Sequence, residues 1–282
     1  MTREGTGMKD VTIRELWTYP VKSCQGVQTE SIEITTMGIL GDRGFAIWAD
    51  GRLVEQKRTP RVASIGAEWD RANGTLTLRH ADHDSYKHQI SDTGTTREAT
   101  WVLDEFATID QGDEVAAWLS PILDRDVRLV TPGEPWKINF PVPQMALLHE
   151  KPKQSFTAAS PVGLANWASL DDLNERFQTP VPMDRFRMNV VVDGLDAYEE
   201  DNITSLANDD VELLNVTPAE RCVIINTDQK TGERPENNLL QVLGEHRAKT
   251  KEERFGSGLK FGNYMTVGRA GTLKVGDRLG VS

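Results

Sequence analysis

The chain has 282 residues, of which 38% are hydrophobic, and its 43 acidic and 32 basic side chains give a formal net charge of -11 at pH 7. Such a surface repels nucleic acid and anionic lipid, so we expect no general binding to either. No segment approaches the roughly 20 apolar residues of a membrane span, and the first residues lack the apolar segment of a signal peptide, so we expect no membrane insertion and a cytoplasmic location.

The first half of the chain is predicted to be all β. Residues 11–23 alternate as in a strand, and the Asp50-Gly51 and Asn73-Gly74 pairs predict hairpins between alternating apolar residues. Residues 11–110 therefore favour a β-barrel or sandwich, followed by a short amphipathic helix over 114–126. A proline-rich segment, 131–143, predicts a domain boundary between residues 9–130 and 145–282.

The second half mixes helices and strands. A helix is predicted over 168–178 with Ser169 as its N-cap, and a second helix over 238–249. Residues 185–194 predict a strand that ends at Asp193-Gly194. Residues 210–228 predict two strands joined by a turn at Thr217-Pro218, and residues 261–281 predict a closing pair of hairpins. We therefore expect an α+β, predominantly β fold: two consecutive β-barrel-like subdomains with a few peripheral helices.

Cys222 is one of only two cysteines, and the other, Cys24, is far away in the sequence. In a cytoplasmic protein both are expected to be free thiols. A cysteine in an apolar run is usually a small buried hydrophobe. However, Arg221 is adjacent and Arg187 lies on a nearby predicted strand, and positive charge favours a thiolate that can act as a nucleophile or soft-metal ligand. Because neighbouring strand residues face opposite sides, Arg221 can also point away.

Basic and polar residues gather near the ends of the predicted strands. Their positions are Lys22 and Ser23 in YPVKSC, Arg43 in GDRGF, Ser160 in AASP, and Arg187 and Asn189 in RFRMN. Because Arg187 and Asn189 are two residues apart, a strand would place them on one face, where they suit an anion such as phosphate. Ion pairs with surface carboxylates are an equal alternative for these arginines.

Five sequence motifs combine into one resemblance. They are YPVKSCQGV, GDRGF, RFRMN, AERCVIINTDQKTGE and FGNYMTVGRAGTLKVGDRL, in that order. This series closely resembles the MOSC family, with residues 10–130 similar to the β-barrel domain that often precedes the MOSC domain. The resemblance includes the mitochondrial amidoxime-reducing components and their bacterial counterparts, so it implies a molybdenum cofactor (Mo-molybdopterin).

The resemblance also implies roles for individual residues. Cys222 would be the molybdenum ligand and catalytic residue. The cofactor-binding residues would be Lys22, Ser23, Arg43, Ser160, Arg187, Asn189, Arg221 and Tyr264. The sequence departs from the family pattern at Ala159 (often Thr), Glu220 (often Ser) and Ile225-Asn226 (often Thr-Thr).

Two functions follow as expectations from the resemblance. The first is an oxidoreductase that reduces small N-hydroxylated or N-oxide compounds. Its electrons would come from a separate flavin or iron–sulfur/haem protein, because the chain lacks ferredoxin-type cysteine spacing and nucleotide fingerprints. The second is a sulfur-carrier or cofactor-handling protein that uses Cys222 as a persulfide or metal ligand. A third alternative is a binding module in which Cys222 is buried and inert.

Overall fold

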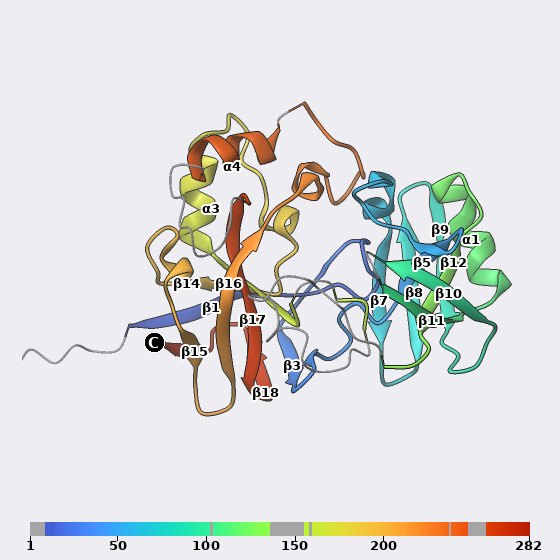
Figure 1. Ribbon diagram of the computed structural model, residues 1–282, viewed down its shortest axis with the longest axis horizontal. Helices are drawn as coiled ribbons and strands as arrows, with labels where there is room; N and C mark the ends of the chain where they lie inside the picture. The colour runs from blue at the N-terminus through green and yellow to red at the C-terminus, as the bar shows by residue number, and fades with distance from the viewer. Residues whose placement is uncertain (1–8, 102–103, 136–154, 158–159, 237, 248–257) are drawn as a thin grey trace, which may run out of the picture.

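Most of the second half of the chain folds into a closed barrel of seven strands (Figure 1). The computed structural model describes residues 9–101, 104–135, 155–157, 160–236, 238–247 and 258–282. The strands, in order around the barrel, are β14 (Val190–Asp193), β13 (Val162–Asn166), β17 (Lys260–Arg269), β16 (Glu212–Glu220), β15 (Ser205–Ala207), β19 (Arg278–Val281) and β1 (Asp10–Thr18).

Strand β1 closes this barrel although it comes from the first half of the chain. It pairs antiparallel with β14 through residues such as Leu16 and Val190, and with β19 through Val11 and Leu279. Alternation turns Val11 and Ile13 into the barrel core, and a register shift between Ile13 and Glu15 makes Leu16 the next core residue. The sequence predicted this strand, but its pairing with β14 and β19, more than 150 residues away, follows only from the fold.

The first half forms a second, five-stranded closed barrel, on the right in Figure 1. Its strands are β10 (Thr96–Trp101), β11 (Asp104–Asp110), β12 (Arg128–Pro132), β5 (Ala46–Ala49) and β6 (Arg52–Leu53). A three-stranded sheet lies beside it, made of β7 (Gly66–Asp70), β8 (Thr75–His80) and β9 (His83–Gln89). Both predicted hairpins are confirmed, because β5 pairs with β6 and β7 pairs with β8.

Among the described residues, three α-helices lie around the barrels. They are α1 (Asp113–Leu123), α3 (Trp167–Asn174) and α4 (Leu239–Arg247). All three were predicted, but the N-cap of α3 is Asn166, whose side chain accepts from the Ala168 amide, and not Ser169. Ser169 is instead fully buried within the helix and binds the Glu200 carboxylate. The predominantly β fold with two barrels and a few helices is therefore confirmed.

The C-terminal strands correct another prediction. β18 (Gly271–Lys274) follows β17 but pairs with β3 (Ser31–Thr35), which also pairs with β4 (Gly38–Ile39). The chain therefore turns near Ala270 without forming a hairpin, and β19 pairs with β15 and β1. Strand β2 (Val27–Thr29) adds to the edge of β1. Tertiary contacts decide these pairings, since local turn residues were compatible with hairpins.

Glu200 is a buried carboxyl that ties η4 (Glu199–Asp201) to α3. It is 0% exposed, and it accepts from the Ser169 hydroxyl at 2.7 Å and the Asn166 amide at 3.2 Å. Burial raises the pKa of Glu200 from its ordinary value of 4.5 to about 7. The folded state therefore binds a proton more readily than the unfolded state, and this contribution to stability is lost as pH rises from about 4.5 to about 7.

We therefore expect the Glu200→Gln variant to lack this pH dependence. Between pH 4.5 and 8, the free energy of unfolding of the wild-type protein should fall by about 3 kcal/mol more than that of the variant. Urea unfolding of both proteins across this range measures the difference. Parallel pH profiles would show that Glu200 stays ionised in the folded protein.

Candidate functional site

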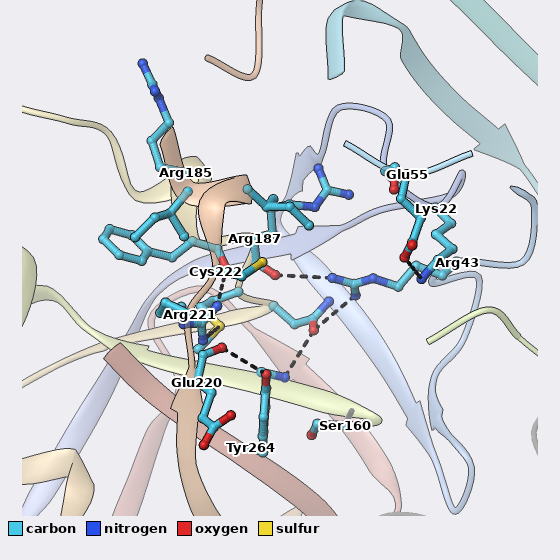
Figure 2. Close-up of a pocket in the computed structure, with 17 residues that line it drawn as sticks. Lys22, Arg43, Glu55, Ser160, Arg185, Arg187, Glu220, Arg221, Cys222 and Tyr264 are labelled. Carbon is cyan, nitrogen blue, oxygen red and sulfur yellow. Dashed lines mark hydrogen bonds and ion pairs between the residues drawn. The ribbon is translucent and has the colours of Figure 1, made fainter. Parts of the chain in front are cut away.

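A cavity of about 250 Å³ lies between the two halves of the molecule. It brings together all nine residues that the sequence singled out: Lys22, Ser23, Arg43, Ser160, Arg187, Asn189, Arg221, Cys222 and Tyr264. Figure 2 shows Lys22 and Arg43 on one side of the cavity and Arg221, Cys222 and Tyr264 on the other. Residues 200 positions apart in the sequence therefore share one site.

Cys222 is exposed, so the alternative of a buried, inert cysteine is wrong. It directly precedes a 3₁₀ helix, η5 (Val223–Asn226), and Cys222 and Cys24 are both free thiols, as predicted. The predicted turn at Thr217-Pro218 is wrong, because β16 continues through both residues to Glu220. Register shifts in the β16–β17 ladder on either side of Pro218 accommodate the proline within the strand. The cysteine therefore lies where a strand gives way to a helix.

Arg221 lines the cavity, but its guanidinium is engaged by neighbouring protein groups and holds the Cys222 segment in place. Its guanidinium donates to the carbonyls of Phe261 and Phe186, both at 2.9 Å, and contacts the Met188 sulfur at 3.2 Å. Burial lowers the pKa of Arg221. These contacts join η5 to β17 and to η3 (Met183–Phe186), so Arg221 positions Cys222 by fixing its backbone.

Arg187 and Asn189 do not share a strand face, which corrects the prediction. Arg187 ends η3 with a left-handed backbone (φ 55°), and β14 begins only at Val190. The 3₁₀ helix replaces the start of the predicted strand, and the left-handed residue redirects the chain into β14. The two side chains nevertheless line the same cavity.

Tyr19 connects two arginines beneath the cavity. The guanidinium carbons of Arg43 and Arg187 each lie 4.4 Å from the centre of its ring, and its hydroxyl donates to the Met188 carbonyl at 3.1 Å. Cation–π contacts of this kind hold a guanidinium in place without neutralising it. Arg43 also donates to the Asp42 carboxylate and, at 3.2 Å, to the Arg187 carbonyl. The two cations are therefore held side by side by the fold.

Arg187 carries further contacts and one free donor. Its Nη1 donates to the Cys24 carbonyl at 2.6 Å and to the Gln229 Oε1 atom at 2.8 Å. Its Nη2 is buried and has no hydrogen-bond partner among the described residues. Burial lowers the pKa of Arg187 to about 10. A cation with an unused donor beside a cavity is suited to an anionic ligand.

Both polar atoms of the Asn189 side chain form hydrogen bonds within the protein. Its Oδ1 atom accepts from the Gly163 amide at 3.1 Å and from Arg43 at 3.4 Å. Its Nδ2 atom donates to the Trp17 carbonyl at 3.1 Å and to the Asp42 carboxylate at 3.3 Å. The side chain therefore positions Arg43 and its carboxylate partner.

Lys22 is a nearly buried cation in an aromatic and acidic setting. It is 7% exposed, and its Nζ lies 3.7 Å from the Trp101 ring centre and 3.8 Å from the Glu55 carboxylate. It also donates to the Phe156 carbonyl at 3.3 Å. Burial lowers the pKa of Lys22 to about 8, which the nearby Glu55 carboxylate only partly offsets. Lys22 is therefore charged at neutral pH but close to losing its proton.

The hydroxyl-bearing residues are used differently. Ser160 donates to backbone carbonyls of Val162 (2.6 Å) and Met265 (2.8 Å), which fixes the start of β13. Ser23 has a left-handed backbone (φ 69°), and its carbonyl accepts from Gln56 at 2.7 Å. Tyr264 donates weakly to the Glu220 carbonyl at 3.3 Å, so its ring and hydroxyl stay at the cavity wall.

Sequence reasoning missed several cavity residues, of which Glu55 and Arg185 are charged. Glu55 also accepts from the Trp101 indole at 2.9 Å, and Arg185 pairs with Asp228 at 2.8 Å. Glu55 lies in none of the quoted motifs, and Arg185 is the first residue of RFRMN, of which only Arg187 and Asn189 were assigned to an anion site. The one sequence signal for Glu55 is the hairpin predicted at Asp50-Gly51, because it reverses the chain and brings the following residues back toward Lys22.

Three departures from the family pattern have different outcomes. The Glu220 carboxylate is directed away from Lys22 and Arg43, toward the lower edge of Figure 2, and packs against Gly258. Asn226 accepts from the Leu240 amide and donates to Asn238, so it anchors the start of α4, while Ile225 is buried. Ala159 lies outside the described residues.

Two family models match the chain in succession. The MOSC N-terminal β-barrel domain matches residues 10–126, and the MOSC domain matches residues 151–280. The human mitochondrial amidoxime-reducing component 1 is 31% identical over 274 residues, which cover 94% of this chain and 81% of the relative. This chain belongs to the MOSC family. The human mitochondrial amidoxime reducing component 2 is 32% identical over 277 residues, with 94% and 82% covered.

The cavity of this MOSC protein is built by both matched regions. Lys22, Ser23 and Arg43 fall within the MOSC N-terminal match, whereas Arg187, Cys222 and Tyr264 fall within the MOSC match. The crystal structure of the YUAD protein from Bacillus subtilis is 12% identical and aligns over 98% of this chain and 97% of that one, with a TM-score of 0.42, too low to support any argument. Within the described parts of this MOSC protein, no helix is long and apolar enough to cross a bilayer.

Proposed function

We propose that this chain is a molybdenum-cofactor-dependent reductase of small N-hydroxylated or N-oxide compounds. The observation that carries the proposal is the exposed Cys222 thiol on the same cavity as Lys22, Arg43 and Arg187, in an otherwise acidic chain. The relatives named amidoxime-reducing components support the reaction class, because an amidoxime is an N-hydroxylated compound. For such a substrate, two electrons and two protons convert the N–OH group into N–H and water.

The residues present fit the cofactor that the family implies. Molybdopterin carries a phosphate, and Arg187 offers a buried donor without a partner among the described residues. Arg43 lies beside Arg187 on the ring of Tyr19, and Lys22 adds further positive charge at the cavity. Cys222 offers a soft sulfur, which suits molybdenum. When bound, the cofactor supplies two-electron oxygen-transfer chemistry, and the protein supplies binding and orientation.

The contacts divide the site residues into two groups. Lys22, Arg43, Arg187, Tyr264 and Cys222 would contact the cofactor, since all five line the cavity with charged, phenolic or thiol groups. The others act through them: Asn189 positions Arg43, Arg221 positions the backbone of Cys222, and Ser160 and Ser23 fix the cavity wall. The protein thus presents a prearranged cationic surface, which lowers the cost of ordering it on binding.

Reduction of an amidoxime by the purified protein tests the proposal. Protein from a host grown with molybdate should convert benzamidoxime to benzamidine when reduced methyl viologen supplies the electrons. Protein from a host grown with tungstate in place of molybdate should not. No conversion by protein with stoichiometric bound molybdenum would contradict the proposed reaction.

The exposure of Cys222 also favours one alternative, in which this thiol carries sulfur. In that case the purified protein would release sulfide on treatment with a thiol reductant, and it would not reduce the amidoxime. Mass spectrometry of the intact protein would show an extra sulfur atom on Cys222. The two functions are therefore distinguished by these two measurements.

Cofactor retention should depend on pH through Lys22. Because the pKa of Lys22 is lowered to about 8, its charge is present below pH 8 and is lost as pH rises above it. Wild-type protein dialysed at pH 9 should therefore lose more pterin and molybdenum than protein dialysed at pH 7. The Lys22→Arg variant, which stays charged throughout, should show no such difference. Equal pH dependence in both proteins would assign the effect to another group.

A further inference from the structure

Two neighbouring loops carry a group of unpaired cations on this acidic protein. We name them the basic rim, which consists of Lys57, Arg58, Arg61, Lys230 and Arg234. All five are exposed, and none forms an ion pair within the described residues. By contrast, the exposed residues Arg79, Arg125 and Arg278 each pair with a carboxylate. With a net charge of -11 over the whole chain, such a group is unusual.

The two loops of the basic rim are in direct contact. A Cβ atom on Gly232 would lie 2.7 Å from the Arg61 Cα atom, so the backbones touch at this point. Arg234 donates to the carbonyls of Gln56 at 2.5 Å and Lys57 at 3.1 Å. In Figure 1 the orange segment after η5 reaches across to the blue coil of η1 (Pro60–Ser64), which joins the two halves.

The carboxylates of these loops only partly offset the positive charge. Asp228 pairs with Arg185, and Glu55 is directed to Lys22 and Trp101. Glu233 and Glu236 are exposed on the same segment as Arg234. The outward charge of the rim is therefore positive but local and interrupted, and an extended polyanion would meet the repulsion of the remaining surface.

The basic rim lies directly behind one wall of the cavity. Gln56, whose carbonyl binds Arg234, also donates through Nε2 to the Ser23 carbonyl at 2.7 Å and to Gln229 at 2.8 Å. The same Gln229 oxygen accepts from Arg187 at 2.8 Å. One layer of buried amides thus separates the rim from the cavity, so a protein docked on the rim would lie close to the site.

We propose that the basic rim is the docking surface for an acidic electron-transfer protein. This inference rests on the proposed reductase function, which consumes two electrons per turnover. Two cysteines cannot provide the four ligands of an iron–sulfur cluster, so the chain has no such donor of its own. Complementary charge speeds the encounter of two proteins and orients them, and both effects weaken with salt.

Charge reversal at the rim tests this docking surface. The test variant is Lys57→Glu/Arg58→Glu, whose side chains make no contact with the cavity. The matched control is Lys87→Glu/Lys274→Glu, which makes the same change in charge at two exposed positions outside the rim. The probe is a reduced acidic plant-type [2Fe–2S] ferredoxin, and both its binding and the ferredoxin-driven reduction of benzamidoxime are measured at several salt concentrations.

The rim variant should bind the ferredoxin at least about tenfold more weakly at low salt and lose the salt dependence, whereas the control should resemble the wild type. With reduced methyl viologen as the electron donor, all three proteins should reduce benzamidoxime equally. If none of them does, the reductase function itself is refuted. Equal ferredoxin binding by the rim variant and the control, or no ferredoxin binding by the wild type, would overturn the proposal. The proposal would also be overturned if the protein bound phosphatidylserine vesicles through the rim and did not bind the ferredoxin.

Discussion

The Cys222→Ser variant should lose nearly all bound molybdenum and all amidoxime reduction while it keeps its fold. Cys222 is exposed at the cavity, and a serine hydroxyl is a much poorer ligand for a soft metal centre. Removing the ligand itself should exceed the roughly 10–100-fold loss that follows from changing a group that merely supports a metal ligand. Metal analysis and fluorescence of the extracted pterin measure the loss.

Cys24 provides the matched control for this experiment. It is fully buried, and burial raises the pKa of its thiol to about 12. The Cys24→Ala variant should therefore keep its molybdenum, since the hydrogen bond from Arg187 goes to the backbone carbonyl of Cys24, which alanine retains. Full molybdenum content in Cys222→Ser, with unchanged activity, would remove Cys222 from the proposed site.

The Arg187→Ala variant should retain the cofactor roughly 10–150-fold less tightly than the wild type. This range corresponds to the loss of one charge-assisted hydrogen bond, worth about 1.5–3 kcal/mol. The buried Nη2 atom of Arg187 is the donor available for an anion, whereas its Nη1 atom is already engaged. Pterin content after repeated gel filtration gives the measurement.

Two further variants separate anion binding from stability in the Arg187 experiment. Arg187→Lys keeps the charge but lacks the planar fork, so it should fall between the alanine variant and the wild type. Arg14→Ala removes an arginine that stacks on Trp167 and pairs with Asp193 away from the cavity, and it should retain the cofactor fully. Unchanged pterin content in Arg187→Ala would show that Arg187 is only a structural residue.

Local sequence patterns predicted where strands and helices lie better than which strands pair with each other. Asp50-Gly51 predicts a hairpin because few other residues adopt the required backbone, and Asp50 and Gly51 indeed have positive φ values of 50° and 77°. Pro218 misled the prediction, because a proline can lie in a strand where the ladder shifts its register. Pairing of β18 with β3 depends on packing across the whole chain, which local turn residues do not encode.

The candidate site was predictable at the level of residues but not of contacts. Lys22, Arg43, Arg187 and Cys222 lie in separate motifs, and only the resemblance to a family united them. Tyr19, by contrast, is an ordinary aromatic residue in the sequence, and its position between two guanidinium groups follows from the fold alone. The sequence left open that Arg221 points away from Cys222, but nothing in it indicated that the Asn189 side chain forms its hydrogen bonds within the protein.

Closure of the seven-stranded barrel by β1 makes the two halves dependent on each other. Without residues 10–18, β14 and β19 would each expose a row of unpaired amides and carbonyls, which promotes edge-to-edge aggregation. A gene fragment that encodes only the MOSC match would produce an open sheet as well as an incomplete cavity. Recombination between relatives would therefore be expected to exchange both halves together. If only one half were exchanged, a β1 strand from one protein would have to pair with β14 and β19 of another.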